Sequence, residues 1–166
     1  MNKVLEEIKI TLTVNGKTKQ VIVKPNESLL DVLRREFKIF TIKGACEQGI
    51  CGLCTVLVDG KPIKSCMALA YEFDGSNITT IEGLRNTKEL KVIQQKFIEH
   101  KAFQCGFCTP AFELMAYHLI TKYKRALNYE EVAKHINGVL CRCTGYKPII
   151  EAIIDASKTI SIEQKS

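Results

Sequence analysis

The sequence has no tryptophan, no G-x-G-x-x-G motif and no run of 18 consecutive apolar residues. Without such a run it contains no candidate transmembrane helix, and without the glycine motif it has no dinucleotide-binding signature of its own. Residues 1–7 are charged and include no apolar stretch of signal-peptide length, so we expect no secretory leader. No nucleophile beside a base and no paired carboxylates can be recognised. We therefore expect a chain that does not convert a substrate alone.

Basic residues outnumber acidic ones, and the formal net charge is +6. The lysines and arginines are scattered along the chain and form no basic stripe interleaved with aromatic side chains. We therefore expect an ordinary solvated surface and no nucleic-acid partner.

Cysteine, in contrast, is frequent, with eight residues that fall into two groups of four. A disulfide framework would require an oxidising compartment, whereas a cytoplasmic, reducing location suits thiolates that bind metal. Thiolates select iron–sulfur clusters, zinc or Cu(I) over magnesium and calcium. The first group is Cys46, Cys51, Cys54 and Cys66, and the second is Cys105, Cys108, Cys141 and Cys143.

The first group has the spacing Cys-x4-Cys-x2-Cys, and its fourth cysteine follows after eleven further residues. This is the spacing of a plant-type ferredoxin, whose four cysteines hold one [2Fe–2S] cluster. Gly44, Gly49 and Gly52 lie among the ligands, as expected for a loop that brings backbone amides close to sulfur. Zinc more often uses short Cys-x2-4-Cys pairs, so this group favours a cluster.

The second group consists of Cys-x2-Cys and Cys-x-Cys pairs separated by 32 residues. Two short pairs at a distance are also common in four-cysteine zinc sites. Taken alone, this group therefore fits zinc as well as it fits a second [2Fe–2S] cluster.

Hydrophobic alternation and turn signals predict a small sheet in the first half of the chain. Asn15-Gly16 and Asp59-Gly60 are expected to close two hairpins, and Ser28 is expected to begin a helix between them. The expected strands are 8–14, 17–23, 55–58, 63–66 and 78–81.

After Gly83 the apolar period changes from two to about 3.6, which predicts helices. Thr109 with Pro110, Asn128 with Glu131, and Thr144 are expected to begin three of four helices. The sequence thus predicts an α+β chain with a boundary within residues 74–85. The expected domains are 1–82 and 83–166.

The segments Gln104–Pro110 and Cys141–Tyr146 match a known family in residue type as well as in spacing. With the first cysteine group they make the chain resemble the small iron–sulfur subunit of the molybdenum hydroxylases, which include xanthine dehydrogenase, aldehyde oxidoreductase and carbon monoxide dehydrogenase. The resemblance covers about residues 5–160. Ala45 and Ala111 stand where glycine is common in the family.

The resemblance implies a β-grasp, plant-type ferredoxin-like domain followed by a four-helix domain, each with one [2Fe–2S] cluster. It implies a large molybdopterin-binding subunit and a medium FAD-binding subunit as partners, with the second cysteine group nearest the pterin and the first toward the flavin. Gln104 is then expected to contact the molybdopterin. Among the substrates of such complexes, an aldehyde is our preferred expectation.

Two other interpretations stay open at this point. The chain could be a free-standing ferredoxin-like carrier with two clusters and no permanent partner. It could also be a structural zinc protein, in which case iron–sulfur absorption in the visible range would be missing.

Overall fold

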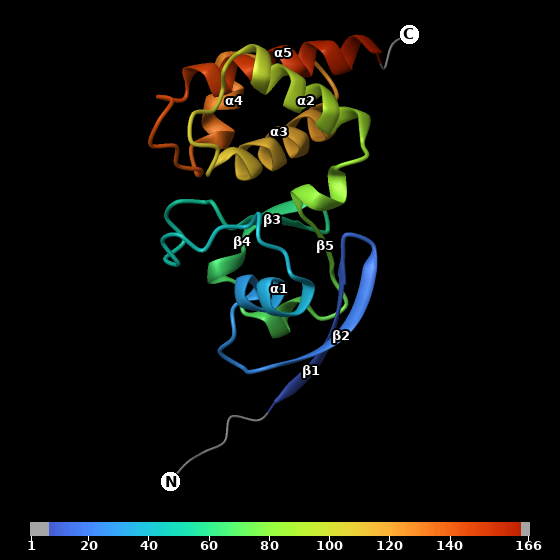
Figure 1. Cartoon of the computed structure of the whole chain (residues 1–166). Coiled ribbons are helices and arrows are strands. Elements are labelled where there is room, and N and C mark those ends of the chain that lie inside the picture. The colour runs from blue at the N-terminus through green and yellow to red at the C-terminus, as the bar shows by residue number, and fades with distance from the viewer. Residues whose placement is uncertain (1–6, 164–166) are drawn as a thin grey trace. The chain divides into compact units, whose positions relative to one another are not determined.

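The computed structural model describes residues 7–163 and divides the chain into two compact units, with the division between Gly83 and Leu84 (Figure 1). The first unit is built around a sheet, and the second is helical. The predicted α+β class is confirmed.

The first unit contains a five-stranded sheet in the order β2-β1-β5-β3-β4. Strands β1 and β5 are parallel and the other neighbours are antiparallel. Helix α1 (Leu29–Phe37) buries Leu29, Leu30, Val32 and Leu33 in one core with the sheet, so the expected β-grasp arrangement is present. The strands are β1 (Ile8–Val14), β2 (Lys17–Val23), β3 (Thr55–Val58), β4 (Lys61–Lys64) and β5 (Asn77–Thr79).

The two hairpin turns have the backbone conformation that their sequences predict. Asn15 and Gly16 have φ values of 51° and 80°, and Asp59 and Gly60 have 47° and 77°. Positive φ at both central residues is the type I′ geometry, which matches the twist of the flanking strands. These two turns therefore fix the register of β1 with β2 and of β3 with β4.

The last two strands differ from the sequence expectation. Strand β4 ends at Lys64, and Cys66 lies in a 3₁₀ turn, η1 (Ser65–Met67). Ser65 is buried and donates to the Cys54 carbonyl oxygen through both its amide (3.3 Å) and its hydroxyl (2.7 Å). The pairing of β4 with β3 therefore stops before Ser65. Strand β5 covers Asn77–Thr79 only, because the chain turns into a 3₁₀ helix, η3 (Ile81–Leu84). A third 3₁₀ helix, η2, covers Ala70–Phe73.

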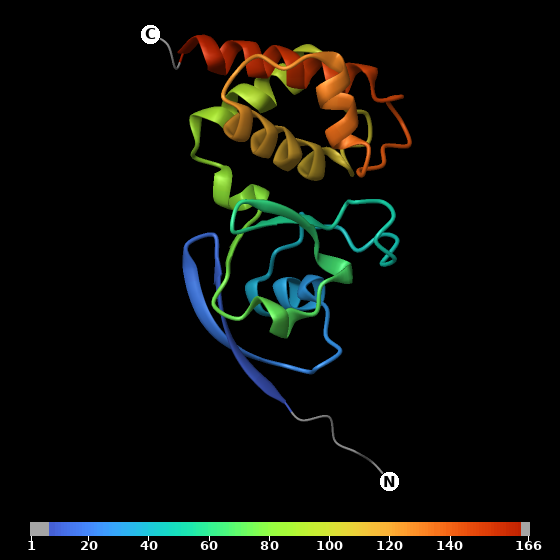
Figure 2. The same ribbon diagram turned by 180° about the vertical axis from the view of Figure 1, so that it is seen from behind.

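The helical unit has four α-helices within its described residues, as predicted. Its core includes Ile93, Phe97, Phe112, Ile120 and Ile153, all at most 2% exposed. The helices are α2 (Lys88–Glu99), α3 (Thr109–Tyr123), α4 (Tyr129–Ile136) and α5 (Lys147–Glu163), and Figure 2 shows them from the opposite side.

The helix starts agree with the sequence at α4 and differ at α3 and α5. Asn128 and Glu131 form a full capping box at the start of α4. At α3, however, Cys108 occupies the N-cap and Thr109 is the first helical residue, because the Thr109 amide bonds to the Gly106 carbonyl in the preceding turn. Thr144 lies three residues before α5 and bonds within the loop instead of capping the helix.

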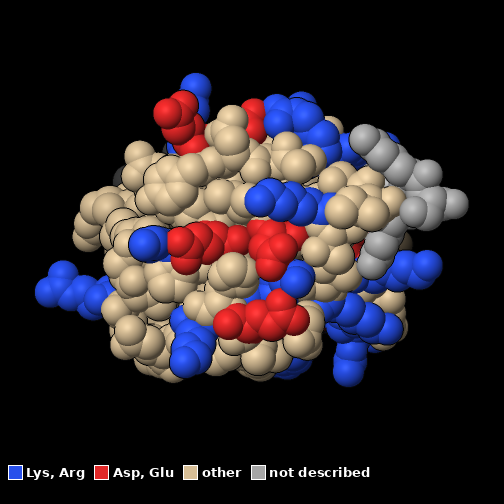
Figure 3. Space-filling model, turned by 90° about the horizontal axis from the view of Figure 1, so that it is seen from above, with Lys and Arg blue, Asp and Glu red and all other residues tan. Residues whose placement is uncertain are grey.

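Charged side chains of both signs are interspersed on the face of the molecule seen in Figure 3. In residues 7–163 no helix is both long enough and apolar enough to cross a membrane.

Glu113 is a buried carboxyl group on α3, only 7% exposed. Gln94 of α2 donates to it at 3.2 Å, but burial outweighs this bond and raises the pKa of Glu113. The folded protein therefore holds this proton more tightly than the unfolded chain, and stability is lost as the pH rises above the usual carboxyl range. A poorly compensated buried group costs about 1–3 kcal/mol.

Glu113→Gln is therefore expected to raise the thermal midpoint, and the gain should grow between pH 4 and pH 8.5, from below the ordinary carboxyl pKa to well above it, because only the wild type ionises. About 1 kcal/mol corresponds to roughly 4 °C or more in a domain of this size. Thermal melts at both pH values, with exposed Glu130→Gln on α4 as the matched control, measure the effect. An equal gain at both pH values would mean that ionisation of Glu113 is not its cause.

Candidate metal centres

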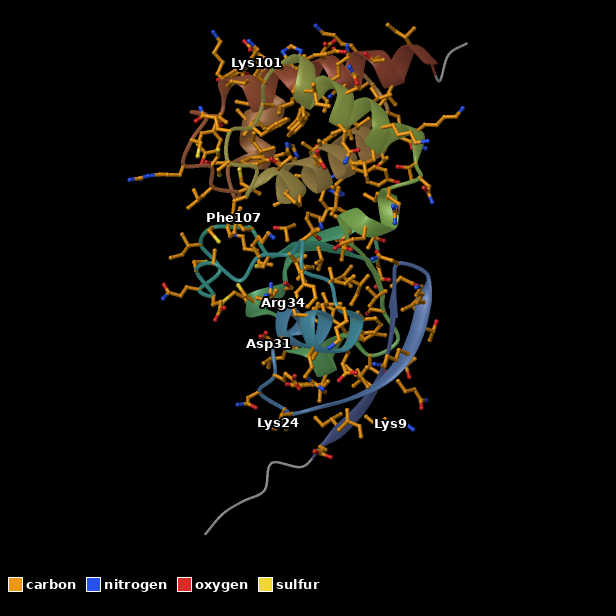
Figure 4. The ribbon with its side chains drawn as sticks, viewed as in Figure 1. Lys9, Lys24, Asp31, Arg34, Lys101 and Phe107 are labelled. Atoms are coloured by element: carbon orange, nitrogen blue, oxygen red, sulfur yellow. The ribbon has the colours of Figure 1, made fainter. Side chains whose placement is uncertain are left out.

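The first cysteine group lies on a loop between α1 and β3, together with the η1 turn. Residues 38–54 contain no helix or strand, and a few hydrogen bonds hold them. Lys64 Nζ donates to the Gly49 carbonyl at 2.6 Å, and Arg34 of α1 donates to the Ile42 carbonyl at 3.0 Å. Figure 4 labels Arg34 on α1, beside this loop.

Glycine is favoured at position 49 by its backbone conformation, and a side chain there would also displace the exposed Met67 side chain. The φ of Gly49 is 71°, and a Cβ atom there would lie 2.8 Å from Met67 Cγ. The loop therefore passes against the residue that follows Cys66, and the distant fourth cysteine pairs with Cys54 of the loop.

Within the first group the thiols form two pairs, Cys46 with Cys51 and Cys54 with Cys66. Cys46 Sγ accepts the amides of Cys51 (3.3 Å) and Gln48 (3.4 Å), and these bonds lower the pKa of Cys46 to about 6. Burial, together with the neighbouring Cys66 thiol, raises the pKa of Cys54 to about 11. A cation between the pairs would stabilise both as thiolates.

The second group lies at the start of α3 and on the loop between α4 and α5. It also forms two pairs: Cys105 with Cys143, whose sulfur atoms are 3.7 Å apart, and Cys108 with Cys141. Burial and the adjacent Cys141 raise the pKa of Cys108 to about 12. Phe107, labelled in Figure 4, lies in the turn between Cys105 and Cys108 and is half exposed.

The pairwise arrangement provides a test of which metal centre fits. In residues 7–163 no three Cys, His, Asp or Glu side chains converge as ligands of a single ion. A tetrahedral zinc site requires four ligands around one ion, whereas a [2Fe–2S] cluster places two cysteines on each of two irons. Two pairs in each group therefore fit the cluster better than they fit zinc.

A buried hydroxyl beside the second group also fits a bound cluster. Thr109 Oγ1 is inaccessible to solvent and has no hydrogen-bond partner within the described residues. Thr109 directly follows Cys108, and an orphaned buried donor normally has an acceptor. The sulfur atoms of a cluster would provide one.

Gln104 and two residues that sequence reasoning missed arrange the second loop. Gln104 Nε2 donates to the Cys143 carbonyl at 3.0 Å, and its contact to a molybdopterin stays a prediction. Thr144 Oγ1 lies 3.1 Å from Cys141 Sγ, and the Tyr146 hydroxyl accepts the Cys141 amide at 3.1 Å. The sequence predicts Thr144 as a helix start, whereas its hydroxyl lies against the Cys141 sulfur three residues earlier.

Two of the histidines have local partners that account for them. His100 Nε2 lies 3.1 Å from an Asp155 carboxylate oxygen, and His135 Nε2 lies 3.0 Å from the Tyr123 hydroxyl. Neither contact involves a cysteine of the two groups.

Comparison with known families finds two cluster-binding models along the chain. Residues 12–79 match a "2Fe-2S iron-sulfur cluster binding domain", and residues 80–154 match a "[2Fe-2S] binding domain". Together the matches include all eight cysteines.

Relatives and solved structures match over nearly the whole chain. The nicotine 6-hydroxylase small subunit of Paenarthrobacter nicotinovorans is 42% identical, over 91% of this chain and 90% of its own. The nicotinate dehydrogenase small FeS subunit of Eubacterium barkeri is 40% identical, over 90% and 94%. The crystal structure of quinoline 2-oxidoreductase from Pseudomonas putida 86 superposes with a TM-score of 0.86 at 38% identity, over 96% of this chain and 99% of the matched chain.

The fold and the matched domains define a protein with two 2Fe-2S binding domains. The chain belongs to the small iron–sulfur subunits of the molybdenum hydroxylase family, as its resemblance implied. It is thus a non-catalytic electron-transfer subunit of an oxidoreductase complex.

Proposed function

We propose that each cysteine group ligates one [2Fe–2S] cluster, with one pair of thiolates on each iron. The observation that carries this proposal is the pairing of all eight thiols, which in the second group joins segments far apart in the sequence. Bound there, each cluster would take up and release one electron at a time. The pairs are Cys46 with Cys51, Cys54 with Cys66, Cys105 with Cys143, and Cys108 with Cys141.

The partners we propose are a large molybdopterin-binding subunit and a medium FAD-binding subunit. The second group then receives electrons from the molybdenum side and the first delivers them toward FAD. Cys105 and Cys143 are exposed, which supports close approach of a partner to the second group. Gln104 adjoins this exposed pair through the Cys143 carbonyl, which supports its proposed contact with the pterin.

The functional division we propose is 1–82 for the first cluster and 83–166 for the second. A reducing, cytoplasmic location is proposed as well, because the eight thiols are free and metal thiolates persist under reducing conditions.

The relatives of this chain belong to complexes named for different substrates. Relatives of this subunit are named for nicotine, nicotinate, caffeine and aldehydes. The similarity of this chain to its relatives therefore fits either an aldehyde substrate, which was the expected class, or a nitrogen heterocycle.

Anaerobic purification of the full chain from its native host tests the proposal. We expect about four irons and four acid-labile sulfides per chain, visible iron–sulfur absorption, and elution together with a large molybdenum protein. A cluster-containing species near the mass of the chain alone would favour the free-standing carrier. Bound zinc in place of iron would contradict the proposed function.

A further inference from the structure

The loop between α4 and α5 places a side-chain hydroxyl against a cysteine sulfur of the second group. Thr144 Oγ1 lies 3.1 Å from Cys141 Sγ and also accepts the Tyr146 amide at 3.3 Å. Since the amide uses a lone pair of the hydroxyl oxygen, the hydroxyl proton is free to point at the sulfur. A metal-bound thiolate has no proton, so Thr144 is the donor in this contact.

Tyr146 holds this contact in place from the other end of the loop. Its hydroxyl accepts the Cys141 amide at 3.1 Å, and its ring packs edge-on against Phe112 of α3, with centroids 6.1 Å apart. Gly145 and Tyr146 have φ values of 65° and 69°, which turn the chain back toward Cys141. Tyr146 therefore holds both ends of the Cys141–Thr144 segment, through its hydroxyl at Cys141 and through its backbone amide at Thr144.

The other cysteine sulfurs have different surroundings. Cys46 in the first group accepts two backbone amides and pairs with the Cys51 thiol, and Cys105 and Cys143 contact each other. In the second group, the Thr144 contact joins a side-chain hydroxyl to a cysteine sulfur. In the first group, the Ser65 hydroxyl favours the ionised form of the Cys54 thiol, but it donates at 2.7 Å to the Cys54 carbonyl oxygen. Removal of the Thr144 hydroxyl should consequently affect the second cluster and spare the first.

We propose that the Thr144 hydroxyl sets the reduction potential of the second cluster by donating a hydrogen bond to the Cys141 thiolate. This inference rests on the proposed function. One-electron reduction adds a negative charge to the cluster, so a donor to sulfur stabilises the reduced form more than the oxidised form. The cluster is thereby easier to reduce than it would be without the hydroxyl.

A redox titration of the cluster-loaded full chain, poised with dithionite and followed by EPR, tests the proposal. Thr144→Val keeps the side-chain shape without the hydroxyl, and Thr144→Ser keeps the hydroxyl. We expect Val to shift the one-electron reduction equilibrium of the second cluster about tenfold against reduction, equal to about 59 mV. The first cluster should not shift, and Ser should titrate close to wild type.

Thr159→Val is the matched control, because the Thr159 hydroxyl donates to the Asp155 carbonyl within α5 and not to a cysteine. It should leave both potentials unchanged. If Thr144→Val does not load its second cluster, the smaller Thr144→Ala gives the same comparison.

An unchanged second-cluster potential in the hydroxyl-free variant, or an equal shift of both clusters, would overturn the role of Thr144. Both EPR signals would still be present in that case, and the proposed function would stand. Absence of a second cluster in the wild-type chain would instead contradict the proposed function itself.

Discussion

Replacing Cys143 by serine is expected to abolish the native EPR signal of the second cluster and to stop electron flow from molybdenum to external acceptors. Cys143 and Cys105 form the exposed pair of the second group, 3.7 Å apart, so the change removes one of the two thiolates that we propose for one iron. The first group lies in the other unit and shares no ligand with it. Its signal should therefore persist, so one of the two reduced-state spins per chain is lost.

Cys66→Ser is the reciprocal variant, since it removes a thiolate from the Cys54 pair of the first group. It should leave the second signal intact and still allow molybdenum to reduce that cluster. EPR of the dithionite-reduced complex and dye reduction by the complex measure both variants. If Cys143→Ser removed only the first signal, the assignment of the cysteine groups to the two clusters would be wrong.

Removal of iron and sulfide is expected to lower the thermal midpoint of the full chain by about 10 °C or more. Each unit is near the size at which a core alone is marginal, and the ligand loops have little regular structure to hold them. Binding energy at a site absent from the unfolded chain becomes folding energy. A loss of only a few kcal/mol per unit corresponds to this shift.

Circular dichroism melts of iron-free and reconstituted protein measure the effect. Reconstitution with iron and sulfide should restore the original midpoint, which controls for damage during removal. An unchanged melting curve without iron would show that the two cores are stable without their clusters.

Local turn and cap chemistry made much of the fold predictable. Asn15-Gly16 and Asp59-Gly60 adopt the positive φ values that only a few residue types favour, and Asn128 with Glu131 caps α4 as expected. The cysteine spacings likewise indicated two groups of four, because ligand loops constrain sequence distance directly.

The remaining differences come from contacts between distant segments. β4 ends early because the Ser65 hydroxyl donates to the Cys54 carbonyl, eleven residues away. The strand propensities of the residues do not predict this contact. Which cysteines pair, and the position of Thr144 against Cys141, depend on how loops from two places in the chain meet. Spacing alone left the second group open between zinc and iron, and the pairwise geometry favours two irons.

Mössbauer spectroscopy of the full chain, enriched in the Mössbauer-active iron isotope, tests the central claim most directly. Two clusters with paired thiolates predict about four irons per chain, all ferric when oxidised. After full reduction they should divide into equal numbers of localised ferric and ferrous sites. Zinc in place of iron, or a single averaged valence typical of a four-iron cluster, would contradict the account.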